Sequence, residues 1–196
     1  MAPPAPDGGA EPDPLRPLPE TVAELLSAEP PDLASVLGTV RAEHAGWHDL
    51  HDRLVAIIAA LLDDAVERGE ALAPLLDRVI ARTSVGVGDL VGAVPGADAV
   101  AALLRAHHST GVVERDGVGT TTFVHECGSG LALWRRMPDV ATVAAGEVPG
   151  VPAGVPRYCA RCIATIDAFA GSRWRVSPPG GPEGRCRWEL DGTPGG

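Results

Sequence analysis

The amino-acid sequence predicts an α+β protein in which a helical N-terminal half packs on a small antiparallel sheet with a cysteine-bearing helix. From residue 19 to about residue 108, apolar residues recur three and four positions apart, which is the period of an amphipathic helix. From residue 109 to residue 191 the pattern changes to short β-rich runs separated by glycine and proline turns. We therefore expect a helical region followed by an α+β module, the two forming one compact unit.

Four helices are expected in the helical region. A short one covers "PETVAELLSAE" and stops at Pro30–Pro31, because proline lacks the amide hydrogen that a helix interior needs. Asp32 is a suitable N-cap for a longer helix, for which Gly69 is the expected stop. A third helix spans residues 71–83 and a fourth covers "DAVAALLRAHH", with the glycine-rich residues 84–96 as a connection between them.

Four segments of the α+β module are predicted to be strands. Two β-rich runs flank Asp116–Gly117, a dipeptide typical of a hairpin turn. "SRWRVS" and "RCRWEL" are two further strands, and the second alternates apolar and charged residues as a half-buried strand does. "RYCARCIATIDAFA" predicts a helix, and the ambiguous stretch before it allows a short helix at residues 138–145.

Composition excludes several classes of function. Residues 1–18 are acidic and Pro-rich, so we expect a disordered tail rather than a signal peptide, and we interpret the protein as cytoplasmic. No apolar run approaches the roughly 18 residues of a membrane span. The net charge is −10 and all 16 basic residues are arginine without a basic stripe, which argues against nucleic acid as a partner. The four cysteines are expected to be reduced.

Three histidines form the first candidate site. His44, His48 and His51 are spaced i, i+4 and i+7, so on a helix their imidazoles project from one face. Such a set can chelate a metal ion, and His48 is a candidate catalytic base. The alternative is that these histidines interrupt a core stripe and hydrogen-bond a partner helix.

Cysteine and histidine residues in the C-terminal module form the second candidate site. His125 and Cys127 are two apart in "FVHECGSG" and would share one face of a strand, while Cys159 and Cys162 form a C-x-x-C pair. Thiolate and imidazole ligands suit a tetrahedral zinc ion, so zinc is the expected cofactor if one is bound. In the other interpretation a cysteine is the nucleophile, or the cysteines are small buried residues.

Four further residues of ionisable or reactive type have both a functional and a structural interpretation. Asp167 follows Cys162 on the same predicted helix and could orient a histidine or act as a base, or lie at an exposed edge. Cys186 alternates with Trp188 and is interpreted as core. His107 and His108 close a helix, where the dipole alone favours histidine.

The C-terminal half resembles the L-2-amino-thiazoline-4-carboxylic acid hydrolase family. The resemblance covers about residues 110–190 and is carried by "FVHEC", "CARCIATID" and "GRCRWEL". It implies a helical part ahead of an α+β module, and an activity that opens a cyclic amidine-like C–N bond with water to give an S-carbamoyl-cysteine product. It implies Cys127, Cys162 and Asp167 as site residues and Cys186 as a structural member. The last motif is also similar to one in vinyl-reductase-type ligand-binding domains.

From these observations we expect a hydrolase that cleaves a C–N bond of a small amino-acid-like substrate, in a specialised-metabolite pathway. Cys162, Asp167 and His48 are the expected catalytic residues, and His125, Cys127, Cys159 and Cys162 are the expected metal ligands. The alternative is a non-enzymatic module that holds a metal or a small ligand. The sequence does not predict an oligomeric state.

Overall fold

The structure is a computed structural model, and it describes residues 18–83, 96–116, 119–170 and 174–190, with the side chains of 169 and 170 excepted. The predicted Pro-rich tail therefore lies outside the described residues, apart from Leu18. The same is true of the predicted connection up to residue 95 and of Gly117 in the hairpin turn. By its contacts, the chain divides into two units, Met1–Asp49 and Leu50–Gly196.

The first unit contains helix α1 (Leu18–Ser27) and the beginning of the long helix α2 (Leu33–Glu67). Asp32 caps α2 as predicted, because its Oδ1 accepts a hydrogen bond from the Ser35 amide at 3.0 Å and its Oδ2 accepts one from the Ser35 hydroxyl at 2.6 Å. These bonds lower the pKa of the Asp32 carboxyl. None of the residues that the structure describes in this unit is buried.

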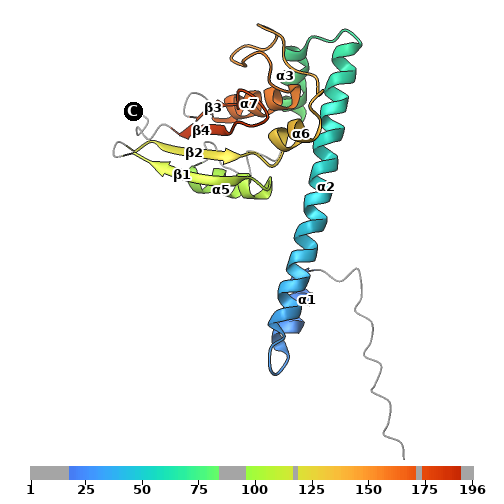
Figure 1. Cartoon of the computed structure of the whole chain (residues 1–196), viewed down its shortest axis with the longest axis vertical. Helices are drawn as coiled ribbons and strands as arrows, with labels where there is room; N and C mark the ends of the chain where they lie inside the picture. The colour runs from blue at the N-terminus through green and yellow to red at the C-terminus, as the bar shows by residue number, and fades with distance from the viewer. Residues whose placement is uncertain (1–17, 84–95, 117–118, 171–173, 191–196) are drawn as a thin grey trace, which may run out of the picture. The chain divides into compact units, whose positions relative to one another are not determined.

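The second unit combines helices with one four-stranded sheet, so the α+β prediction is confirmed (Figure 1). All strand pairs are antiparallel, and the strand order is β1-β2-β4-β3. The elements beyond α2 are α3 (Leu72–Thr83), α5 (Ala97–Ala106), β1 (Thr110–Arg115), β2 (Thr121–Glu126), α6 (Gly130–Arg136), α7 (Arg157–Ala170), β3 (Trp174–Ser177) and β4 (Cys186–Leu190).

One predicted helix is misplaced. Residues 138–145 form turns and a bridge between Thr142 and Pro156 instead of a helix, and the helix α6 lies just before them. Pro138 explains where α6 ends, because the residue before a proline is pushed out of helical geometry. Beyond it, the amide of Val143 bonds to the carbonyl of Val155, so this stretch pairs with the loop before α7 instead of forming a helix. Met137, which precedes it, has φ −129° and ψ 80° and closes α6.

Three apolar clusters hold this unit together, and the two larger ones surround the sheet and α7. The first joins one face of the sheet to α5 and α7, with Phe123, Trp188 and Trp174 on the sheet side. The second joins the later part of α2 to α3, α7 and the loop before α7, with Leu72 and Leu76 among its most buried members. None of the described helices is both long enough and apolar enough to be a candidate membrane span.

We expect Leu76→Ala to lower the free energy of unfolding by about 2–5 kcal/mol, because Leu76 is 1% exposed and truncation leaves a cavity in the second cluster. Urea denaturation followed by circular dichroism measures this loss. The matched control Leu61→Ala should change the free energy by less than about 0.5 kcal/mol, since Leu61 is 62% exposed. Equal losses in the two variants would contradict the assignment of the core.

Candidate active site

A cavity of about 190 Å³ lies in the second unit, beside the sheet face that carries Trp188. All four cysteines of the chain line it. Its wall is mostly apolar, and none of the described residues that line it is an aspartate or a glutamate. The polar and ionisable side chains of its wall are His107, Ser109, Cys127, Ser129, Tyr158, Cys159, Arg161, Cys162, Thr165 and Cys186.

Cys127 stands at one wall of this cavity, in the turn that leads from β2 into α6. The glycines around it are required by close packing. A Cβ atom on Gly128 would lie 2.0 Å from the carbonyl oxygen of His107, and one on Gly130 would lie 2.7 Å from the sulfur of Cys159. The two glycines of "CGSG" therefore allow this turn to pack closely against the end of α5 and against α7.

The sulfur of Cys127 is surrounded by hydrogen-bond donors. The thiol of Cys186 bonds to it, and the amides of Leu131, Ser129 and Gly130 also point at it, with the Ser129 nitrogen at 3.4 Å. The Cys186 hydrogen bond is the largest cause that lowers the pKa of Cys127 to about 6, against the opposing effect of burial. This shift favours the thiolate form of Cys127 near neutral pH.

The other three cysteines are held as neutral thiols. Burial and the neighbouring Cys127 raise the pKa of Cys162 to about 12, and burial raises that of Cys159 as well. The hydrogen bond to Cys127 is the main cause that raises the pKa of Cys186 far above its ordinary value. Among the four thiols, Cys127 is thus the one whose surroundings favour ionisation.

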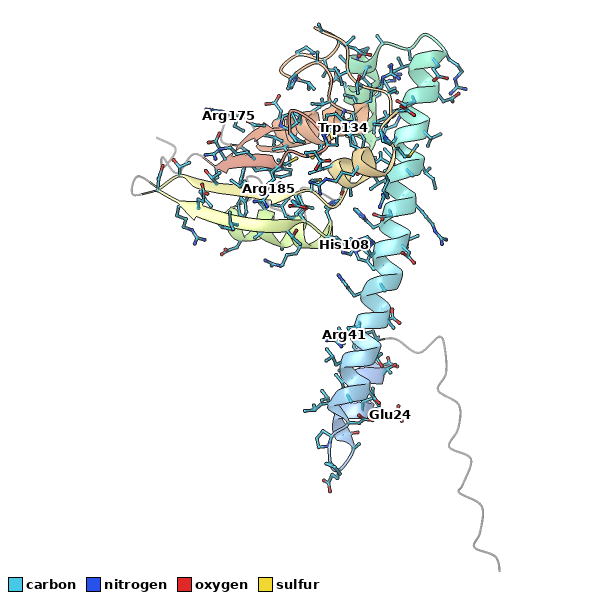
Figure 2. All side chains as sticks on the ribbon, in the orientation of Figure 1. Glu24, Arg41, His108, Trp134, Arg175 and Arg185 are labelled. Atoms are coloured by element: carbon cyan, nitrogen blue, oxygen red, sulfur yellow. The ribbon has the colours of Figure 1, made fainter. Side chains whose placement is uncertain are left out.

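A buried cluster of His51, His107 and Ser129 lies next to Cys127. The Ser129 Oγ is 3.0 Å from Nε2 of His51 and 2.9 Å from Nδ1 of His107, and these two nitrogens are 2.9 Å apart. His108, labelled in Figure 2, stands edge-on to His51 with ring centroids 5.2 Å apart. The cluster joins α2, the end of α5 and the start of α6, whose sequence positions are far apart.

Proton positions in this cluster follow from its neighbours. The Asp52 carboxylate is 3.5 Å from Nδ1 of His51 and pairs with Arg136 through its other oxygen. Because a carboxylate favours a proton on the nitrogen that faces it, we assign Nε2 of His51 as the acceptor of the Ser129 hydroxyl. Burial is the main cause that lowers the pKa of His107 to about 4, so His107 is neutral and can donate from Nδ1 to Ser129.

Arg161 supplies the positive charge of the cavity wall. Its guanidinium carbon lies 5.7 Å from the centre of the Tyr158 ring. Many arginines in the described part of the chain pair with a carboxylate, but no ion pair is found there for Arg161. Burial raises the pKa of Tyr158 to about 12, so this hydroxyl stays protonated and can bond to Ser129. The site is therefore suited to an anionic group.

His125 is not part of the cavity wall. It packs edge-on against Trp188 at a centroid distance of 5.9 Å, and is 3% exposed. Among the described residues neither ring nitrogen has a hydrogen-bond partner, and burial lowers the pKa of His125 to about 4. His125 pairs with Cys186 across β2 and β4, so it lies near Cys127 in the sheet while facing the tryptophan.

The remaining predicted site residues lie elsewhere. Asp167 is exposed on α7 and borders a second hollow together with Asp77 and Arg175. His44 is exposed, and His44 and His48 belong to the first unit, whereas His51 belongs to the second. Of the predicted catalytic residues, Cys162 is the one that lines the cavity.

The predicted zinc ligands are not assembled as a set. Within the residues that the structure describes, no three His, Cys, Asp or Glu side chains are grouped so that they could hold a metal ion. His125 lies outside the cavity that Cys127, Cys159 and Cys162 share. A bound zinc stays a prediction.

Sequence reasoning missed Ser129, Tyr158 and Arg161, and it assigned His107 only to the end of a helix. One signal was present: a serine between two glycines directly after a β-strand marks a tight turn into a helix. The partners of that serine, His51 and His107, lie 78 and 22 residues before it in the sequence.

No family model matches the chain, and no curated protein or solved structure matches it. The resemblance to the amino-thiazoline carboxylate hydrolases therefore stays a prediction.

Replacing Cys186 by alanine should raise the pKa of Cys127, because the largest stabiliser of the thiolate is removed. A hydrogen bond to a charged group contributes about 1.5–3 kcal/mol, which corresponds to an upward shift of roughly one to two pH units. The pH dependence of iodoacetamide alkylation at Cys127, followed by mass spectrometry, measures the shift. Cys159→Ala is the control and should keep the midpoint near pH 6. An unshifted midpoint in Cys186→Ala would show that this hydrogen bond is absent.

Replacing His125 by phenylalanine should make the protein less sensitive to acid. The folded pKa of His125 is about 4 and its ordinary value is 6.5, so its contribution to stability is complete above pH 6.5 and is lost as the pH falls to 4. Between about pH 7.5 and pH 4, wild type should lose on the order of 3 kcal/mol more unfolding free energy than His125→Phe. Urea denaturation at both pH values gives the difference. His44→Phe, on an exposed position, should behave as wild type, and the same acid loss in His125→Phe would refute the burial of a neutral imidazole.

Proposed function

We propose that the second unit is a thiol-dependent hydrolase that cleaves a C–N bond of a small amino-acid-like substrate, with Cys127 as the nucleophile. The observation that carries this proposal is the position of Cys127 on the wall of a mostly apolar cavity, where hydrogen-bond donors lower its pKa to about 6. A thiolate is the reactive form of cysteine, and a cysteine acts as a nucleophile at neutral pH when its surroundings lower its pKa. The catalytic role passes from Cys162 to Cys127, since Cys162 is a protonated thiol at neutral pH.

The size and charge of the cavity support a small anionic substrate. Its volume of about 190 Å³ exceeds the roughly 150 Å³ of an engineered cavity that holds benzene, so a small ring with a carboxylate substituent fits. Arg161 can bind the carboxylate, because it lines the cavity and no carboxylate is found paired with it in the described part of the protein. The apolar walls formed by residues such as Leu104 and Ile166 would hold the ring.

The chemistry is a covalent two-step hydrolysis of an amidine-type group. The Cys127 thiolate attacks the amidine carbon and forms a C–S bond, the C–N bond breaks, and the leaving nitrogen takes a proton. Water then attacks the same carbon, and Cys127 leaves as a thiolate again. The backbone amides at the start of α6 help Cys127 to leave, because they stabilise its negative charge.

The buried His51–His107–Ser129 cluster is suited to the proton transfers. The Ser129 hydroxyl lines the cavity and is hydrogen-bonded to both imidazoles, so it can pass a proton to the leaving nitrogen and recover one from the attacking water. Asp52 stabilises the imidazolium form of His51 that arises during this transfer, and Arg136 keeps Asp52 in place.

Turnover of L-2-amino-thiazoline-4-carboxylate and of a panel of cyclic amidines tests the proposal. We expect ring-opened product from wild type and at least a 10³-fold loss of kcat in Cys127→Ser, because a neutral hydroxyl replaces the thiolate. In wild type kcat/KM should rise with pH through about pH 6 as Cys127 ionises.

The control for this experiment is Asp167→Asn, on the exposed side of α7, which should keep wild-type kcat. Full activity in Cys127→Ser would refute the proposed nucleophile. Tight binding of the panel by wild type without any turnover would instead favour the alternative, a small-ligand-binding module.

A further inference from the structure

We propose that Cys127 and Cys186 are a redox modification site at which a hydroperoxide converts the two thiols into a reversible disulfide. The disulfide chemistry needs only these two residues. Its consequence for turnover, reversible inactivation, rests on the proposed function, since oxidation would remove the nucleophile.

The first support is the position of the two residues in the sheet. His125 and Cys186 are paired across β2 and β4, and Cys127 follows His125 by two residues, so both cysteines lie at the same end of these strands. The Cys186 thiol is hydrogen-bonded to the sulfur of Cys127, and both side chains line the same cavity. Cys127 is the first residue after β2 and Cys186 is the first residue of β4, and both side chains pack in the first apolar cluster.

The second support is that the other two thiols are placed differently. The sulfur of Cys159 packs against Gly130, where a Cβ atom would lie 2.7 Å from it. Cys162 lies on α7 and interacts with Cys127 electrostatically, whereas Cys186 is the cysteine that bonds to it. All four cysteines are free in the structure, so the proposed pair is available.

The reaction is balanced in two steps. The Cys127 thiolate attacks the terminal oxygen of the hydroperoxide, the O–O bond breaks, and the product is a sulfenic acid, while the alkoxide takes a proton and leaves as an alcohol. Cys186 then loses its proton and attacks the sulfur of the sulfenic acid, which forms the disulfide and releases the hydroxyl as water. The two thiols are oxidised by two electrons, and the hydroperoxide is reduced to alcohol and water.

Oxidation of Cys127 in the first step allows Cys186 to attack in the second step. While Cys127 is negatively charged, it holds the proton on Cys186 through the hydrogen bond between them. A sulfenic acid is neutral, so the charge that retained the proton disappears and Cys186 can ionise and attack. In the reduced protein Cys186 is thus a protonated thiol that donates a hydrogen bond to Cys127. After Cys127 is oxidised, Cys186 ionises and its thiolate forms the disulfide.

The test treats the reduced full-length protein with tert-butyl hydroperoxide and maps the products by peptide mass spectrometry. We expect one disulfide that joins the Cys127 and Cys186 peptides, with the loss of two hydrogen atoms, and full reversal by dithiothreitol. In Cys186→Ala the sulfenic acid on Cys127 should persist, label with dimedone and proceed to sulfinic acid. Cys162→Ala is the matched control and should form the disulfide as wild type does.

A disulfide between any other pair, or sulfinic acid on Cys127 of wild type while Cys186 stays reduced, would overturn the inference. The readout does not depend on turnover. A protein that forms the disulfide but hydrolyses none of the cyclic amidines would refute only the proposed function, and a protein that turns over but forms no disulfide would refute only this inference.

Discussion

The arrangement of the site depends on one interaction, the hydrogen bonds to the sulfur of Cys127 that favour its negatively charged form. A thiolate beside an apolar cavity is unfavourable unless donors replace the water that it has lost. The turn between β2 and α6 supplies backbone amides, and Cys186 on the neighbouring strand supplies a thiol. Both sources require a fixed backbone, which explains why Gly128 and Gly130 pack so closely against α5 and α7.

The surroundings of Cys127 are consistent with that charge. The part of the cavity wall that the structure describes contains no carboxylate that would repel it, although the protein as a whole carries a net charge of −10. Neutral His107 and protonated Tyr158 meet at Ser129, so the polar groups next to the sulfur can donate protons without adding charge. Among the described residues of the wall, Arg161 adds a positive charge, and the same charge that favours an anionic substrate also favours a thiolate.

The sequence predicted the fold better than the site. The helices α2 and α3, the cap at Asp32 and the hairpin of β1 and β2 follow from local periodicity and turn chemistry, and all are confirmed. The alternation of apolar and charged residues in β4 predicts that Cys186 is buried, and it is. The alternation does not predict which residue on another strand Cys186 contacts. Whether it meets Cys127 depends on the register of β4 against β2, which no local pattern encodes. The Ser129 cluster was missed for the same reason, since His51 lies 78 residues away.

The titration of the four thiols, followed by the ultraviolet absorbance of the thiolate form, tests the central claim most directly. In wild type one thiol equivalent should ionise with a midpoint of about pH 6, while the other three thiols ionise only at strongly alkaline pH. The step near pH 6 should vanish in Cys127→Ser. A titration in which no thiol ionises below pH 8, or in which the step near pH 6 persists in Cys127→Ser, would contradict the account.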